Sequence, residues 1–172
     1  MTSGPTYTPI ATTTLSSNTT TVTFSSIPAT YTDIVLQATM LQNGSPTATN
    51  GFFQLNSATT GYSKTIMQGN GTTAISYRNT NMDRGYYDMD PSATNWAFHT
   101  YHFMNYANTS TYKTVLSHQN LPSGGVTASV HLWQNTAAIN SISVTASDNM
   151  GAGSSDQFVA GSTFTLYGIA AA

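Results

Sequence analysis

The stretch Trp96-Ala-Phe-His-Thr-Tyr-His-Phe-Met104 decides the fold class of this 172-residue chain. Successive side chains of a β-strand point to opposite faces. The stretch therefore divides into two sets: Trp96, Phe98, Thr100 and His102 on one face, and Ala97, His99, Tyr101 and Phe103 on the other. Because both sets contain bulky aromatic side chains, the pattern predicts a strand that is covered on both faces.

Segments of the same kind recur on both sides of this stretch, rich in Thr, Val, Ile, Tyr and Phe and separated by turn residues. Thr20–Ser25 alternates in the same way, and the apolar run Ile34–Leu41 is the best candidate for a central strand. Pro9 predicts an edge position or a strand start. No segment has helical periodicity. We therefore predict one domain spanning residues 1–172, an all-β, jelly-roll-like antiparallel β-sandwich of about ten strands with no substantial helix.

The polarity of the chain is almost entirely uncharged. Only ten side chains are formally charged and the net charge is −2, whereas Ser and Thr supply 51 of the 172 residues. A nucleic-acid-binding or membrane-surface protein needs clustered Lys and Arg, so we expect neither partner. Cysteine is absent, which excludes a disulfide framework and a cysteine nucleophile. The first residues have neither the basic nor the apolar region of a signal peptide, and no apolar run approaches the ~18 residues of a membrane span.

Half of the charged residues lie in the irregular stretch Arg78–Asn95, which we interpret as a long loop. Long loops in compact domains are often functional. Asp83, Asp88 and Asp90 are the candidate metal ligands, since carboxylates bind Ca²⁺. The spacing of a calcium-binding loop is absent, so we expect no metal and interpret the cluster as Asp–Arg pairs at a subunit contact. On this interpretation, neutralising Arg84 together with Asp88 weakens assembly more than folding.

The same stretch contains Tyr86 and Tyr87, two adjacent aromatic side chains that a loop cannot bury together. Exposed aromatics beside neutral hydroxyls and amides suit both protein interfaces and sugars. We therefore predict a partner interface formed by Arg78, Asp83, Arg84, Tyr86, Tyr87, Asp88, Asp90 and Trp96.

No constellation of catalytic residues is evident. The chain has no Gly-x-Ser-x-Gly elbow and no glycine-rich phosphate loop, and its carboxylates are not accompanied by the other groups of a glycosidase cleft. On one strand His99 and His102 point to opposite faces, which disfavours a shared metal. We expect the histidines to pack on aromatic side chains with their polar tips satisfied. The sequence predicts no enzyme, no catalytic residue and no cofactor.

Both ends of the chain resemble the ends of small virion structural proteins of tailed bacteriophages, notably phages of aquatic bacteria and cyanobacteria. The segments that carry the resemblance are Ile10-Ala-Thr, Val22–Pro28, Tyr31–Leu36 and Gly161–Ile169. The middle of the chain, Leu41–Asn149, contains no motif of this kind, so a specificity of its own could be located there. Because both ends carry the resemblance, we expect the first and last strands to pair in one sheet.

The resemblance implies a non-enzymatic component of the virion exterior that is assembled in the host cytoplasm. The favoured role is a capsid decoration (cement) protein, a jelly-roll-like β-sandwich that binds the major capsid protein or other virion proteins and stabilises the shell. The alternative is a tail fibre, spike or knob adhesin that recognises host-surface glycan. In either role the resemblance implies a homo-oligomer, with a trimer favoured.

Overall fold

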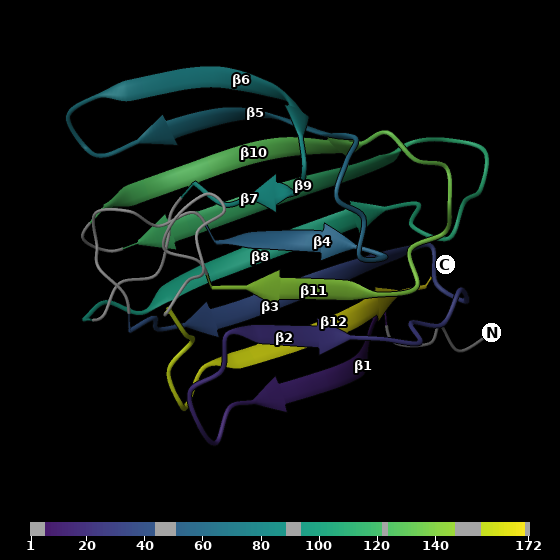
Figure 1. The fold of residues 1–172 in the computed structure, drawn as a ribbon, viewed down its shortest axis with the longest axis horizontal. Coiled ribbons are helices and arrows are strands. Elements are labelled where there is room, and N and C mark those ends of the chain that lie inside the picture. Colours follow the sequence, from purple (N-terminus) through teal and green to yellow (C-terminus); the bar gives the residue numbers. More distant parts are fainter. Residues whose placement is uncertain (1–5, 44–50, 89–93, 122–123, 147–155, 171–172) are drawn as a thin grey trace.

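The computed structural model describes residues 6–43, 51–88, 94–121, 124–146 and 156–170. Twelve β-strands form two antiparallel sheets in this part of the chain (Figure 1). In order across the sheet, the large sheet contains β1 (Tyr7–Thr14), β12 (Thr163–Ile169), β3 (Asp33–Met40), β8 (Ala97–Met104), β9 (Lys113–Leu121), β10 (Gly125–Trp133), β5 (Tyr62–Gly69) and β6 (Ala74–Met82). The small sheet contains β2 (Thr21–Phe24), β11 (Ile142–Thr145), β4 (Phe52–Leu55) and β7 (Gly85–Tyr86). Among the described residues no helix is long and apolar enough to cross a membrane.

Eight of the strands form a jelly roll. β1 pairs with β12, β2 with β11, β3 with β8 and β4 with β7, so the pairs nest like the two arms of one long hairpin. Successive strands of this hairpin alternate between the two sheets, which is the double-sheet arrangement of a jelly roll. The predicted antiparallel β-sandwich is therefore confirmed, with twelve strands instead of about ten. The expected pairing of the first and last strands is also confirmed.

The other four strands are two hairpins, β5–β6 and β9–β10, which widen the large sheet beyond β8. We call β9, β10, β5 and β6 the extension, and β1, β12, β3 and β8 the jelly-roll half of the large sheet. All four strands of the extension come from the middle of the chain, where the sequence carries no resemblance to virion proteins.

The core lies between the two sheets and is largely apolar and aromatic. Val22 and Phe24 on β2 are buried while Thr21 and Thr23 are exposed, as the alternation of Thr20–Ser25 predicts. The ring of Phe53 on β4 lies edge-on to Tyr101 and Phe103 of β8, with ring centroids 5.4 and 5.9 Å apart. Aromatic pairs prefer such edge-to-face arrangements. These contacts join the small sheet to the centre of the large one.

The stretch Trp96–Met104 is covered on one face only. Its set of Ala97, His99, Tyr101 and Phe103 is buried against the small sheet. The opposite set points away from the small sheet, and Phe98 retains 44% of its surface exposed. The expectation that both faces are covered is therefore wrong for the isolated chain. The reason is that no second layer packs against the outer face of the large sheet in the part of the chain that the structure describes.

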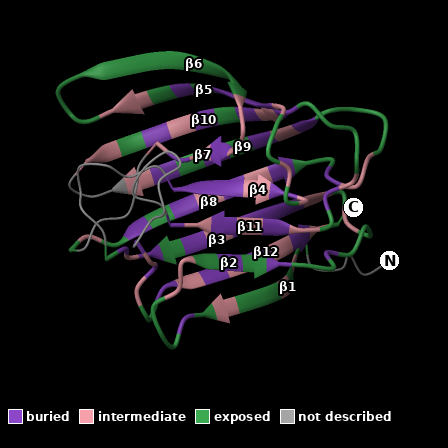
Figure 2. Cartoon of the chain, viewed as in Figure 1, coloured by how far each residue is buried: buried purple, intermediate pink, exposed green. Residues whose placement is uncertain are grey.

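The stretch Arg78–Asn95 is not one long loop. β6 continues to Met82 because its residues pair with β5, Arg78 lying opposite Thr65. Gly85 and Tyr86 then form β7 at the edge of the small sheet. Figure 2 shows that β6 is exposed along its length. Because neither face of β6 is buried, its sequence lacks the alternation of apolar and polar residues that would have predicted a strand. Asp90 lies outside the described residues.

Candidate functional site

The inner face of the extension is unusually polar. Inward positions on β3 and β12 carry only apolar residues and glycine, whereas the inward positions of β5, β9 and β10 include Lys64, Ser117, Gln119, Thr127, Ser129 and His131, all buried. The register places Lys64 opposite His131, and Ser117 opposite Ser129. Burying such groups is costly unless each finds a hydrogen-bond partner. Their partners define the first candidate site.

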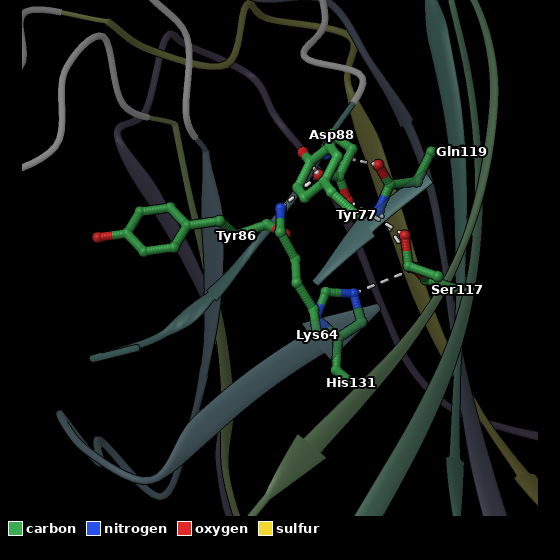
Figure 3. A network of polar contacts seen from close by, with 8 residues as sticks. Lys64, Tyr77, Tyr86, Asp88, Ser117, Gln119 and His131 are labelled. Atoms are coloured by element: carbon green, nitrogen blue, oxygen red, sulfur yellow. Dashed lines mark hydrogen bonds and ion pairs between the residues drawn. The ribbon is translucent and has the colours of Figure 1, made fainter. Parts of the chain in front are cut away.

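Asp88 is the centre of this buried network (Figure 3). It forms an ion pair with Lys64, and the two side chains are only 1% and 5% exposed. The carboxylate also accepts hydrogen bonds from the Tyr77 hydroxyl at 2.8 Å and from the Ser129 hydroxyl at 3.1 Å. Lys64 further donates to the carbonyl oxygen of Tyr86 at 3.3 Å. One carboxylate thus ties the chain after β7 to β5, β6 and β10.

The network continues through Gln119 to His131. The Gln119 side-chain oxygen accepts the backbone N–H of Asp88 at 2.8 Å, and its amide nitrogen donates to the Ser117 hydroxyl at 3.3 Å. The same hydroxyl lies 3.3 Å from Nε2 of His131. Burial, with a smaller contribution from the positive charge of Lys64, lowers the pKa of His131 to about 4, although Asp88 opposes the shift. The imidazole is therefore neutral at physiological pH.

Burial also raises the pKa of the Tyr77 hydroxyl, and the negative charge of Asp88 adds to this effect. Tyr77 consequently stays protonated and donates to the carboxylate throughout the physiological pH range. The protonated Tyr77 hydroxyl can therefore donate to Asp88, and the neutral His131 adds no charge to the network.

Ser117 and His131 resemble two members of a hydrolase triad but do not form one. A nucleophile needs a base that a third group orients, together with access to substrate. Both side chains are 1% exposed, and Nδ1 of His131 has no hydrogen-bond partner among the described residues. The carboxylate of Asp88 is directed to Lys64, Tyr77 and Ser129 instead. This arrangement stabilises the sheet without offering a reactive centre.

Asp83 and Asp88, the two candidate metal ligands that the structure describes, are each bound by other side chains. In the described part of the chain no group of three or more His, Cys, Asp or Glu side chains could hold a metal ion. Asp88 is neutralised by Lys64, while Asp83 is occupied by Arg84 and Tyr86. Asp90, the third candidate, lies outside the described residues.

Tyr87 is not part of an exposed interface. Its side chain is 1% exposed, its ring lies edge-on to His99 at 5.2 Å, and its hydroxyl donates to the carbonyl of Thr145 at 2.9 Å. The ring occupies the space that a side chain on Gly51 would need, since a Cβ there would lie 2.0 Å from a ring carbon. The absent side chain of Gly51 lets the core accept Tyr87, which corrects the prediction that this residue is exposed.

Three of the predicted interface residues form a small surface cluster beside β7. Arg84 Nε lies 2.9 Å from the carboxylate of Asp83, and the Tyr86 hydroxyl donates to that carboxylate at 2.9 Å. The Arg84 guanidinium also stacks over the ring of Phe52 at 4.3 Å. Burial, followed by the hydrogen bond to Asp83, raises the pKa of Tyr86.

The remaining predicted interface residues lie on other elements. Arg78 is exposed on β6, and Trp96 is 44% exposed just before β8. Together with the burial of Tyr87 and of the Asp88 side chain, this placement means that the seven predicted residues that the structure describes do not form one continuous surface.

An accessible apolar surface that the sequence did not predict lies on the outer face of the extension and β8. Six of the eleven exposed large hydrophobic side chains in the described part point outward here: Met67, Phe98, Met104, Leu116, Val126 and Val130. A groove of about 720 Å³ crosses these strands, and a smaller hollow of about 230 Å³ shares three of its lining residues, Met67, His118 and Ala128. This outer-face groove is the second candidate site.

A signal for this groove is present in the sequence. In Val126–Val130 the apolar valines alternate with Thr127 and Ser129. Ordinary reasoning places the valines inside and the hydroxyls outside, but the structure has the reverse.

The comparisons with known proteins add no assignment: no protein-family model matches the chain, and no curated protein matches it significantly.

Proposed function

We propose that this protein is a non-enzymatic virion structural protein, a capsid decoration protein that attaches to the capsid shell through the outer-face groove. The observation that carries the proposal is the gathering of six exposed hydrophobic side chains on one face. Contiguous exposed apolar surface marks an interaction site on a soluble protein. With only ten charged residues, the chain also has little charge to keep such a surface soluble, which favours a protein that functions docked on a larger particle.

The division of the fold supports a virion role. The segments that resemble phage virion proteins form β1, β2, β3 and β12, which belong to the jelly roll. The groove is lined mainly by strands from the middle of the chain. A shared scaffold at the chain ends with an individual docking surface in the middle suits a family of proteins that attach to different shells. Many copies on one particle turn modest single-site affinity into stable attachment.

The proposal is tested by counting copies of the protein on particles that are assembled with variant chains. Met67→Ser combined with Val126→Ser removes two exposed apolar side chains from the groove, and we expect the occupancy to fall while the fold is retained. Tyr112→Ser is the matched control because Tyr112 is 56% exposed but does not line the groove. Unchanged occupancy of the double variant, or only a few copies near the tail, contradicts the proposal.

A second candidate function is recognition of host-surface glycan by a fibre or spike. It is favoured by the mixed lining of the groove, where the exposed ring of Phe98 lies near the imidazole of His118 and the amide of Asn120. A stacking ring with a few polar groups is the usual chemistry of a sugar site. Binding to a glycan array that is lost in Phe98→Ala, combined with low copy number, supports this function over capsid decoration.

A further inference from the structure

The edges of the two sheets are protected very unequally. Edge strands present unpaired N–H and C=O groups, which proteins protect with proline, bulges, charges or short length. β1 contains Pro9 and a register shift between Pro9 and Ala11. The edges of the small sheet are the four-residue β2 and the two-residue β7. β6, the other edge of the large sheet, has nine residues, no proline and a single charged side chain, Arg78. Its register shift against β5 lies at its far end, after Asn79, and leaves Ala74–Asn79 regular.

β6 is also exposed on both of its faces. Every residue from Ala74 to Asn81 is exposed, including Ile75 at 46% and Tyr77 at 41% (Figure 2). A long edge strand with apolar side chains, and with neither proline nor register shift from Ala74 to Asn79, is a template for another strand. The backbone itself therefore specifies the occupant, because only an extended chain can satisfy a row of ladder groups.

The hairpin turn shows which backbone groups are free to pair. The N–H of Asn70 donates to the carbonyl of Thr73 at 3.2 Å, which makes these residues a hydrogen-bonded pair. Because such pairs alternate along an antiparallel ladder, the backbone groups of Ile75 and Tyr77 point toward β5. Those of Ala74, Ser76 and Arg78 point away from the sheet.

We propose that β6 pairs antiparallel with β6 of a second copy of this chain, about a two-fold axis at Ser76. In this register Ser76 lies opposite the partner's Ser76, and Ile75 lies opposite the partner's Tyr77. Two aromatic–aliphatic pairs then cover the exposed apolar side chains of both edges, and such cross-strand pairs stabilise a sheet. An axis at Arg78 opposes two like charges, and an axis at Tyr77 places Ile75 against an asparagine.

A second copy suits this edge because a two-fold contact is self-complementary and closes after two chains. The pairing protects the unprotected edge of both copies at once. It predicts a dimer, which differs from the trimer that the sequence resemblance implies. It pairs the backbone groups of β6, although Ala74, Ile75 and Ser76 of this strand also line the outer-face groove. Met67→Ser with Val126→Ser alters the groove without changing β6, so the solution mass of this double variant separates the dimer from the proposed attachment to a capsid.

The first test is the mass of the full chain in solution from about 1 µM to about 100 µM, by light scattering and sedimentation. We expect a dimer. Ser76→Pro removes an outward N–H in each copy, hence two hydrogen bonds of the dimer, and is expected to weaken association about 30-fold. Ser76→Thr keeps the N–H and should dimerise as the unaltered chain does. A monomer throughout this range, or equal association of the proline and threonine variants, overturns the proposal.

The second test determines the register, and the absence of native cysteine makes it specific. Two copies of Ser76→Cys bring their Cα atoms to about 5.5 Å at the axis, within disulfide range. The matched control Arg78→Cys leaves the Cα atoms of the two cysteines about 14 Å apart in the same register. We expect a cross-linked dimer on oxidation of Ser76→Cys alone. Cross-linking of Arg78→Cys alone, or of neither variant, contradicts the two-fold axis at Ser76.

Discussion

The two halves of the large sheet alternate in the same way but differ in how many polar side chains they bury. In the jelly-roll half, the inward side chains of β3 and β12 are apolar, and threonines face outward and bond across strands, as Thr12 does to Thr165 at 3.2 Å. In the extension, polar side chains face inward around Asp88, and methionine, leucine and valines face outward. The difference teaches that β3 and β12 place their apolar side chains in the core, whereas the extension leaves several of its apolar side chains exposed on the outer face.

Among the variants considered, removing the charge of Asp88 at the centre of the buried network should lower the free energy of unfolding the most. Asp88→Asn leaves the Lys64 ammonium buried without a counter-ion, which typically costs about 3–5 kcal/mol. We expect a loss of this size in the free energy of unfolding, measured by urea denaturation. The sequence led to the expectation that neutralising Arg84 together with Asp88 weakens assembly more than folding, whereas the burial of Asp88 predicts a large effect of this residue on folding.

The double variant Lys64→Met, Asp88→Leu is the control for this experiment. Replacing a buried ion pair with apolar residues of similar volume is often neutral or stabilising, so the double variant should recover much of the lost stability. If Asp88→Asn unfolds within about 1 kcal/mol of the unaltered chain, the extension does not depend on the network and the contrast between the two halves fails.

The next largest effect is the pH dependence that His131 confers on the extension. Its pKa is about 4 in the folded chain, against about 6.5 when unfolded, so the unfolded chain binds more protons between these values. Stability therefore rises with pH across this window and is lost as the pH falls from 6.5 to 4, by about 3 kcal/mol in total. Urea denaturation at pH 7, 5.5 and 4 measures the loss.

Two variants assign this pH dependence to a residue. His131→Gln should remove most of the loss, whereas His118→Gln should retain it because His118 is exposed on the outer face. An equal pH dependence in both variants shows that the titrating group is elsewhere, and that the buried imidazole does not distinguish the extension from the jelly-roll half.

The sequence was sufficient to predict the fold because period-two alternation and turn residues are local signals. The paired chain ends also followed from sequence, since Ile10 and Gly161–Ile169 both belong to the segments with the virion resemblance. The placement of the site did not follow. Alternation divides Val126–Val130 into two sets but does not state which set faces inward, and ordinary hydrophobic reasoning assigns these sets in reverse.

The buried network was missed for a related reason. Lys64 alternates with Tyr62 and Ile66 along β5, so the pattern alone places this lysine on the apolar face of the strand. In a chain with ten charged residues this position was a detectable anomaly, but its partner Asp88 is 24 residues away and only the fold brings the two together. Tyr87 was misplaced because the space beside Gly51 depends on a contact between distant segments.

The smallest effect is expected at the surface cluster beside β7, which tests whether charge matters outside the buried network. Arg84→Gln removes an ion pair with Asp83 in which the two side chains are 28% and 46% exposed, together with the stacking on Phe52. Exposed pairs of this kind contribute about 0.2–1 kcal/mol, and stacking of a cation on a ring at an exposed site about as much again. The midpoint of urea unfolding should therefore shift only slightly, and less in high salt. Asp83→Asn should shift the midpoint by a similar or smaller amount, because this variant keeps the stacking of Arg84 on Phe52. A loss as large as that of Asp88→Asn erases the distinction between buried and surface charge. A fall in particle occupancy at unchanged stability instead adds Arg84 to the docking surface, as the charged stretch of the sequence first suggested.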